Sequence, residues 1–234
     1  MDVASSRFPR PLLRRVAYLR RNRCSALLAM LCVIIVAAPL LSGTPLAGGF
    51  VGIGTMAVLL LAVWALRVRR MTLWAVGVLA LFAVQAIAVE QMGEHWLRPV
   101  VFGSTALFMA VVTLALLRYV LDWHPITTDK VFGAVSAYVL IAFTFASLFN
   151  FIELFDANAF SYAIEKGPYG HLRWSDMMYF SFTVLTSTGF GEITPATGLT
   201  RSLIVLEQVL GVMYVAFLIA RLANLYSGSG LGKK

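Results

Sequence analysis

Long apolar runs, separated by short polar or turn-rich segments, follow one another along the chain. Each run has close to the ~20 residues that an α-helix needs to cross the hydrocarbon core of a bilayer. The runs are residues 24–41, 46–66, 71–89, 99–117, 131–154 and 199–222. This pattern predicts an all-α integral membrane protein with six transmembrane helices.

A shorter apolar segment lies between the last two of these runs. As a helix, residues 174–186 would span about 20 Å, which is enough to enter a bilayer and stop halfway but not to cross it. Ser175 is placed to cap its N-terminus, and Asp176 puts a negative charge where the helix dipole favours one. The polar, turn-rich residues 155–173 before it are typical of an extracellular loop. We therefore expect a re-entrant helix over 174–186.

Composition and charge support a membrane protein. Hydrophobic residues make up 60% of the 234 positions, charged residues make up 13%, and the mean hydropathy is +0.83, which excludes an ordinary soluble domain. The net charge of +8 suggests a topology signal rather than a nucleic-acid partner, because many arginines precede the first run. They are Arg7, Arg10, Arg14, Arg15, Arg20, Arg21 and Arg23. Further basic residues follow the second and last runs, so both termini are predicted to be cytoplasmic.

The basic segment 1–23 is open to two interpretations. Leu12, Val16 and Leu19 lie at helical spacing within it, so the segment could rest on anionic lipids of the inner leaflet, and a solvated tail is the alternative. A cleaved signal peptide is disfavoured, because the following apolar run exceeds the ~7–15 residues of such a peptide.

The residues after the short helix carry the most specific pattern in the chain. They are Thr186, Ser187, Thr188, Gly189, Phe190 and Gly191. A potassium ion crossing a membrane must lose its water, and backbone carbonyls can replace that water only where the chain runs extended with alternating unusual dihedrals. The two glycines permit these dihedrals, and Thr188 and Phe190, which alternate with them, would turn their side chains outward into packing. The hydroxyls of Ser187 and Thr186 can complete the inner end of the stack, so the pattern predicts an ion-selective filter.

A longer stretch around this pattern resembles a known family. Residues 179–195 read Tyr-Phe-Ser-Phe-Thr-Val-Leu-Thr-Ser-Thr-Gly-Phe-Gly-Glu-Ile-Thr-Pro. This stretch resembles the pore helix and selectivity filter of tetrameric potassium channels of the bacterial six-transmembrane type, whose pattern is Thr-x-Gly-Tyr/Phe-Gly-Asp, and the resemblance covers roughly residues 131–224. The positions that differ from the commonest form are Ser187 for Thr, Thr188 for a branched apolar residue, Phe190 for Tyr and Glu192 for Asp. Loss of the Tyr hydroxyl removes one hydrogen bond that could brace the filter.

The resemblance implies passive potassium conduction across the bacterial inner membrane. Potassium ions would bind the filter carbonyls and the Ser187 hydroxyl, and no cofactor is expected. Because a single extended loop cannot surround an ion, we expect a homotetramer with the pore on its axis. Glu192 would then form a ring of carboxylates at the outer mouth. Gly211 matches the hinge glycine of the family's inner helix, and close packing against a neighbouring helix is the alternative explanation.

Glu207 is the acidic residue that the last apolar run has to accommodate. It lies about two turns into the predicted span, where an uncompensated charge is costly. We expect its carboxyl group to be protonated or hydrogen-bonded behind the short helix, and we favour a structural role over a gating role.

The predicted helices divide into a leading domain and a pore domain. The expected parts are a basic cytoplasmic segment 1–23, a four-helix domain 24–118, an intracellular linker 119–130, a pore domain 131–224 (outer helix 131–154, pore helix 174–186, filter 187–191, inner helix 199–222) and a cytoplasmic tail 225–234.

Neither the leading domain nor the tail suggests a gating stimulus. A conventional voltage sensor is not expected, because the run 99–117 holds no charged residue and such a sensor needs several gating charges. The Ser-Gly-Ser-Gly sequence at 227–230 is expected to be a flexible tail.

Two other functions fit parts of the pattern. A weakly selective cation channel is one, because the filter departs from the commonest form at Ser187 and Thr188. A secondary transporter is the other, although no segment in the first half pairs with 174–191 as a second broken helix would. An enzyme is not expected, because the histidines, at positions 95, 124 and 171, all fall in connections between runs.

Overall fold

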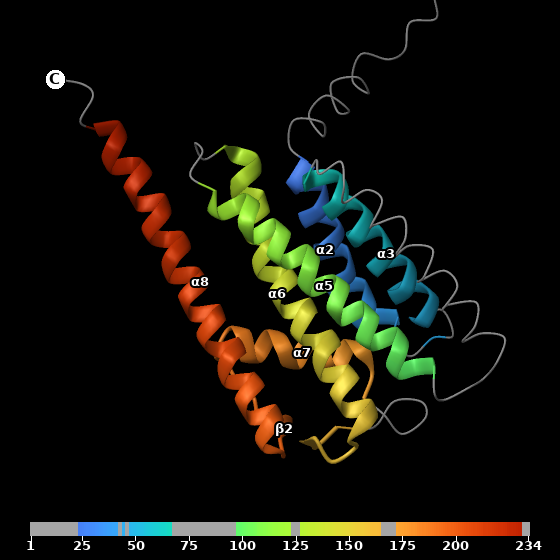
Figure 1. Cartoon of the computed structure of the whole chain (residues 1–234). Helices are drawn as coiled ribbons and strands as arrows, with labels where there is room; N and C mark the ends of the chain where they lie inside the picture. The colour runs from blue at the N-terminus through green and yellow to red at the C-terminus, as the bar shows by residue number, and fades with distance from the viewer. Residues whose placement is uncertain are drawn as a thin grey trace, which may run out of the picture.

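The computed structural model describes residues 23–41, 44, 47–66, 97–122, 127–164 and 172–230. These residues form helices and two short strands (Figure 1). In chain order the elements are α2 (Arg23–Leu41), α3 (Ala47–Leu66), α5 (Leu97–Leu121), α6 (Thr128–Phe155), β1 (Phe160–Tyr162), α7 (Trp174–Leu185), β2 (Ile193–Pro195) and α8 (Gly198–Gly230). The described part of the chain is thus predominantly helical, as the sequence predicts.

Several of these helices have the dimensions of membrane spans. By length and composition, the helices that could cross a membrane are Arg23–Leu41, Phe102–Leu121, Thr128–Phe155 and Gly198–Arg221, and α3 adds a shorter apolar stretch, Gly52–Ala65. Every predicted run that falls within the described residues is therefore helical. The run predicted at 71–89 lies outside the described residues, so a total of six spans stays a prediction.

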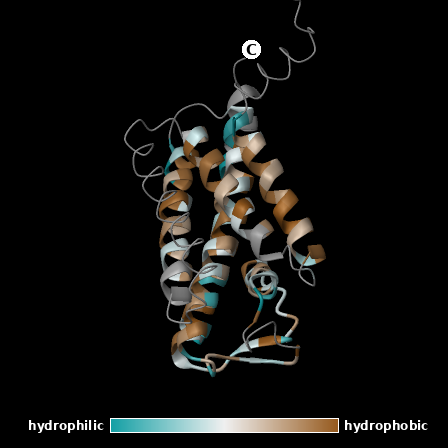
Figure 2. Cartoon of the chain, turned by 90° about the vertical axis from the view of Figure 1, so that its right-hand side faces the viewer, coloured by the Kyte–Doolittle hydropathy of each residue, from teal (hydrophilic) through white to brown (hydrophobic). Residues whose placement is uncertain are grey.

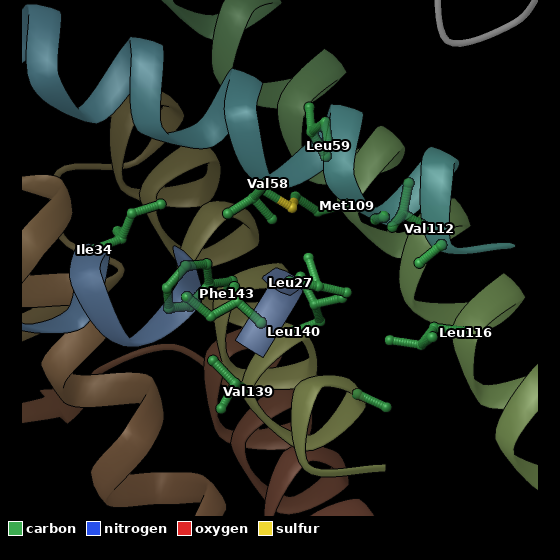
Figure 3. Close-up of a cluster of buried hydrophobic side chains, with 14 of the residues drawn as sticks. Leu27, Ile34, Val58, Leu59, Met109, Val112, Leu116, Val139, Leu140 and Phe143 are labelled. Atoms are coloured by element: carbon green, nitrogen blue, oxygen red, sulfur yellow. The ribbon is translucent and has the colours of Figure 1, made fainter. Parts of the chain in front are cut away.

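The helices α2, α3, α5 and α6 lie side by side as a bundle (Figure 1). Side chains such as Leu27, Met109 and Phe143 are buried between them (Figure 3). Apolar side chains such as Leu40 and Leu114 are exposed on the outside of the bundle, and Figure 2 shows hydrophobic residues along the outer faces of the helices. Because lipid tails are as apolar as leucine, close packing rather than removal from water holds such a bundle together.

Hydrogen bonds between side chains join the helices of this bundle. The hydroxyls of Thr113 and Thr144 lie 3.0 Å apart between α5 and α6. At one end of the bundle, Asp129 accepts hydrogen bonds from the backbone N–H of Cys24 at 2.9 Å and from the Tyr119 hydroxyl at 3.1 Å. This one carboxylate therefore caps the start of α2 and joins α2, α5 and α6.

Local hydrogen bonds set the starts of α6 and α7. Thr127 caps α6, as its sequence allows, and its hydroxyl accepts an amide hydrogen bond from the first turn at 3.3 Å. The predicted cap at Ser175 is wrong, because α7 already begins at Trp174 with Arg173 as its N-cap residue. The Asp176 carboxylate accepts a hydrogen bond from the backbone N–H of Arg173 at 3.0 Å. This bond from the first turn back to the N-cap residue places the cap at Arg173, two residues before Ser175.

The last helix is longer than its apolar run. α8 continues to Gly230, whereas the run ends at 222. The predicted flexible tail is therefore wrong for residues 227–230, which are helical. Each residue added to an existing helix gains one backbone hydrogen bond, so a helix can continue past the segment that its hydrophobic pattern marks.

The short helix α7 crosses between α6 and α8 instead of running along them (Figure 1), and Figure 2 views it nearly end-on. The loop after α7 leads into β2, which pairs antiparallel with β1 in the register Phe160↔Pro195 and Tyr162↔Ile193. This ribbon ties the segment after the loop to the segment after α6.

Candidate functional site

Aromatic contacts fix α7 against α6 and β1. Phe180 packs on Phe149 and Phe160 with ring centroids 5.5 and 5.7 Å apart, and Phe143 meets Trp174 edge-on at 5.4 Å. Tilted and edge-to-face pairs suit the ring quadrupoles. These contacts hold the part of α7 from Trp174 to Phe180 against α6 and β1.

The loop after α7 folds its amide groups back onto the end of this helix. The N–H of Ser187 donates to a carbonyl of the last turn at 2.9 Å, and the N–H groups of Thr188 and Gly189 both donate to the Thr183 carbonyl oxygen, at 2.8 and 3.1 Å. No described peptide bond is cis, and in a trans peptide the C=O points opposite to the N–H of the next residue. The carbonyl groups of Thr186, Ser187 and Thr188 are therefore directed away from α7.

Backbone conformation alternates along the same loop. Ser187, Gly189 and Gly191 have φ values of 57°, 57° and 86°, so every second residue lies in the left-handed region. Around both glycines an added Cβ would meet no atom within 4 Å, so the backbone conformation, not lack of space, is what favours glycine. Ser187 is the one non-glycine residue with positive φ in the described part of the chain. Such a conformation costs about 1–2 kcal/mol, and strained positions of this kind cluster at functional sites.

The side chains of the loop are exposed in the single chain. Residues 186–192 all have exposed surface. The hydroxyl of Thr186 donates to the carbonyl of Phe182 at 2.7 Å and lies 2.9 Å from the hydroxyl of Thr188. Thr188 thus faces a polar neighbour in this chain. The sequence prediction had placed its side chain in surrounding packing, and one chain by itself provides no such packing there.

Tyr179 of α7 supports the part of the loop that holds Phe190 and Glu192. Its ring stacks on Phe190 with centroids 6.1 Å apart and an interplanar angle of 1°. Desolvation, together with a hydrogen bond and the negative charge of Glu192, raises the pKa of the Tyr179 phenol above its ordinary value. Tyr179 therefore contacts both Phe190 and the carboxylate of Glu192 in the loop.

Another carboxyl group lies at the start of α7. Burial raises the pKa of Asp176, while its bonds to Arg173 and Ser175 oppose that shift. The carboxyl group nevertheless accepts the hydrogen bond from the backbone N–H of Arg173 in this partly buried position.

Hydrogen bonds also hold the backbone of Glu192 in place. Its carbonyl accepts a hydrogen bond from the N–H of Ala163 at 2.9 Å, directly before the β1–β2 pairs, and the N–H of Ala196 donates to the Ala159 carbonyl at 3.0 Å. Hydrogen bonds at both ends of the ribbon hold the C-terminal end of the loop to the segment that follows α6.

Two residues of α8 lie behind α7. Glu207 is fully buried, and its carboxyl group hydrogen-bonds the hydroxyl of Ser181 on α7. Glu207 therefore lies against α7, in contact with Ser181. Gly211, one turn further on, lies against the carbonyl oxygen of Leu185 at the end of α7.

Sequence reasoning missed some residues of this site. The sequence pattern marks Ser181 and Tyr179 only as positions of the short helix, although Ser181 bonds Glu207 and Tyr179 stacks on Phe190. Their signal in the sequence is weak, because a hydroxyl in an apolar helix often bonds only to its own backbone. Among the described residues, no three His, Cys, Asp or Glu side chains are grouped so that they could hold a metal ion.

Comparison with known proteins places this site within a recognised domain. The family model described as "Ion channel" matches residues 151–227, about a third of the chain, and spans the end of α6, α7, the loop and most of α8. No curated protein and no solved structure matches the chain. Together with the apolar helices, the match supports an ion channel and indicates a membrane protein.

Proposed function

We propose that the protein conducts potassium ions passively and selectively through a homotetrameric pore, and that residues 186–191 are its filter. The observation that carries this proposal is the alternation of positive φ at Ser187, Gly189 and Gly191, combined with amide groups that turn back onto α7. A backbone of this kind presents carbonyl oxygens on the face away from α7, where they can replace the hydration shell of a cation.

The chemistry of selection follows from these groups. Carbonyl oxygens, completed at the inner end by the hydroxyls of Ser187 and Thr186, would bind dehydrated potassium as the transported ion. The C-terminus of α7 is directed toward the loop and carries the partial negative charge of the helix dipole. This charge would favour a cation on the inner side of the filter. We propose that α7 is re-entrant and that the loop after it lines a water-filled pore. Irregular backbone at membrane depth is tolerated only where it is buried in protein or lines water.

A homotetramer would cover the surfaces that one chain leaves open. Along α8, the exposed apolar side chains include Leu199, Val205, Leu206, Val209, Leu210, Val212, Met213, Val215, Phe217 and Ile219. Lipid can cover part of this surface, and neighbouring copies would cover the part beside the filter. Four loops around one axis would complete the ion sites, and four Glu192 carboxylates would form a cation-concentrating ring at the outer mouth.

The proposal includes a membrane orientation and a mode of gating. Both termini would be cytoplasmic in a bacterial inner membrane, with the basic segment 1–23 near anionic lipids. The pore would not be conventionally voltage-gated, because residues 99–117 hold no charge. The protein would transport ions without converting them chemically.

The test is ion flux into liposomes that contain the purified protein. The Gly189→Ala variant forces an L-residue into φ 57° and should abolish potassium flux. Gly198→Ala is the matched control, because Gly198 lies at the start of α8, has no positive φ, and leaves open space for a Cβ. We expect potassium flux, much less sodium flux, and normal flux for the control.

Two results would count against this proposal. Equal flux of potassium and sodium would support the weakly selective cation channel, because Ser187 and Thr188 depart from the commonest filter pattern. Potassium flux that Gly189→Ala leaves unchanged would move the ion pathway away from residues 186–191.

A further inference from the structure

One hydroxyl group connects three helices behind the candidate filter. Ser181 Oγ on α7 lies 2.8 Å from the carbonyl oxygen of Ala142 on α6, and it also hydrogen-bonds Glu207 Oε1 on α8. Ser181 and Glu207 are both fully buried. The contact is therefore shielded from water, and its hydrogen atoms have to come from the groups themselves.

Counting these hydrogen atoms restricts the chemical state of Glu207. A serine hydroxyl has one hydrogen and can donate only one hydrogen bond, whereas a backbone carbonyl can only accept. If Ser181 donates to Ala142, then the hydrogen between Ser181 and Glu207 has to belong to Glu207. If Ser181 donated to an ionised Glu207 instead, two acceptor oxygens would face each other at 2.8 Å without a hydrogen between them.

The second carboxyl oxygen leads to the same conclusion. Glu207 Oε2 is buried and has no hydrogen-bond partner among the described residues. In an ionised carboxylate this oxygen would carry about half of a negative charge without a donor, and leaving a buried charge unpaired is far more costly than leaving a neutral carbonyl oxygen unpaired. The titratable group that interacts with Glu207 from α6 is Tyr138, and its hydroxyl donates to the carbonyl of Leu185.

We propose that Glu207 is a neutral carboxylic acid that donates a hydrogen bond to Ser181, which in turn donates to the carbonyl of Ala142. This ordered chain of two hydrogen bonds runs from α8 through α7 to α6. Glu207 is then a positioning residue: it holds the helix that carries the loop in place, and it contacts no ion. The protonation state follows from the contacts alone, and only the consequence for conduction rests on the proposed function.

The direct test is infrared difference spectroscopy of the purified full-length protein at neutral pH. A protonated carboxylic acid has a carbonyl stretching band well separated from the bands of ionised carboxylates. We expect this band in the unmodified protein and its loss in Glu207→Gln. Ser181→Ala should shift the band, because the acid loses its acceptor. Glu192→Gln is the matched control: it removes an exposed glutamate and should leave the band unchanged.

Thermal unfolding of the same variants supplies a second readout. Glutamine has nearly the shape of the neutral acid, and its amide N–H can donate to Ser181, so Glu207→Gln should unfold close to the temperature of the unmodified protein. Glu207→Leu keeps the volume but removes the donor, and should unfold at a lower temperature.

The outcomes separate this proposal from the proposed function. A band of a protonated acid that disappears in Glu207→Gln supports the proposal even if the liposomes show no flux. If the protonated-acid band is unchanged in Glu207→Gln and an ionised carboxylate band is lost instead, the proposal is overturned even if potassium is conducted. If flux is observed, Glu207→Gln should retain it and Glu207→Leu should reduce it, and the reverse order would also overturn the proposal.

Discussion

The backbone of Gly211 on α8 lies so close to the end of α7 that a Cβ atom at this position would be 2.2 Å from the carbonyl oxygen of Leu185. The same atom would be 3.1 Å from the Leu185 carbonyl carbon and 2.9 Å from a side-chain methyl group of this residue. Glycine at 211 therefore has a packing reason in the single chain. A hinge role for Gly211 stays a prediction, because bending would have to occur at a helix contact.

We predict that Gly211→Ala destabilises the protein by about 1–3 kcal/mol, as overpacking in a close contact does. A backbone carbonyl, unlike a flexible side chain, cannot move aside without displacing the end of α7. Thermal or denaturant unfolding would measure the loss of stability. Gly52→Ala is the control, since no atom lies within 4 Å of a Cβ there. A Gly211→Ala variant of normal stability with altered flux would instead favour the hinge.

The Tyr179 phenol should titrate at a higher pH than an ordinary tyrosine. Desolvation and Glu192 raise its pKa above the ordinary value of 10.0. Because the folded pKa lies above the unfolded one, the stabilising contribution of the protonated phenol is present below about pH 10 and is lost as the pH rises through the folded value. Ultraviolet absorbance of phenolate, compared between the unmodified protein and Tyr179→Phe, would measure this titration.

The same titration in Glu192→Gln tests the cause of the shift. Removing the negative charge should bring the Tyr179 pKa closer to the ordinary value, because the charge disfavours a second anion nearby. If Glu192→Gln left the titration of Tyr179 unchanged, the hydrogen bond between these side chains would not be the support of the outer loop that we describe.

Arg221 should hold the second half of α8 to the end of α5. Its guanidinium group donates to the carbonyl oxygens of Val120, in the last turn of α5, and of Asp122, directly after it. Carbonyl groups at the end of a helix lack partners within the helix. Hydrogen bonds from charged groups contribute about 1.5–3 kcal/mol, so Arg221→Gln should speed amide hydrogen exchange at the end of α8 by about tenfold or more.

Mass spectrometry of peptides from α8 would measure this exchange. Arg201→Gln is the control, because Arg201 is an exposed arginine at the opposite end of the same helix. An equal change in both variants would mean that loss of charge alone, and not loss of the contacts with α5, affects α8.

Asp129 should contribute to the stability of the helix bundle. Asp129→Ala removes the acceptor for the N–H of Cys24 and for the Tyr119 hydroxyl, and we expect a loss of about 1–3 kcal/mol. Asp129→Asn keeps one acceptor oxygen and should restore part of that loss. Unfolding of the two variants side by side measures both effects, and equal stability of Asp129→Ala and the unmodified protein would contradict this role.

Features that depend on neighbouring residues could be predicted from the sequence. The apolar runs have helical length, and they are helices wherever the chain is described. Gly189 and Gly191 were assigned unusual dihedrals, and both have positive φ. The physical causes of both features are local. The helices form because exposing polar backbone to lipid is costly, and the dihedrals are accessible because glycine has no Cβ.

Features that depend on distant residues could not be predicted in the same way. The Ser181–Glu207 bond joins positions 26 apart in the chain, and the contact from Arg221 to Val120 joins positions 101 apart. Ser187 adopts positive φ although serine does not demand it, because amide bonds back to α7 require the conformation. Hydrophobic length and glycine positions therefore predict the helices and the type of loop, whereas the packing of α6, α7 and α8 determines which polar groups meet behind it.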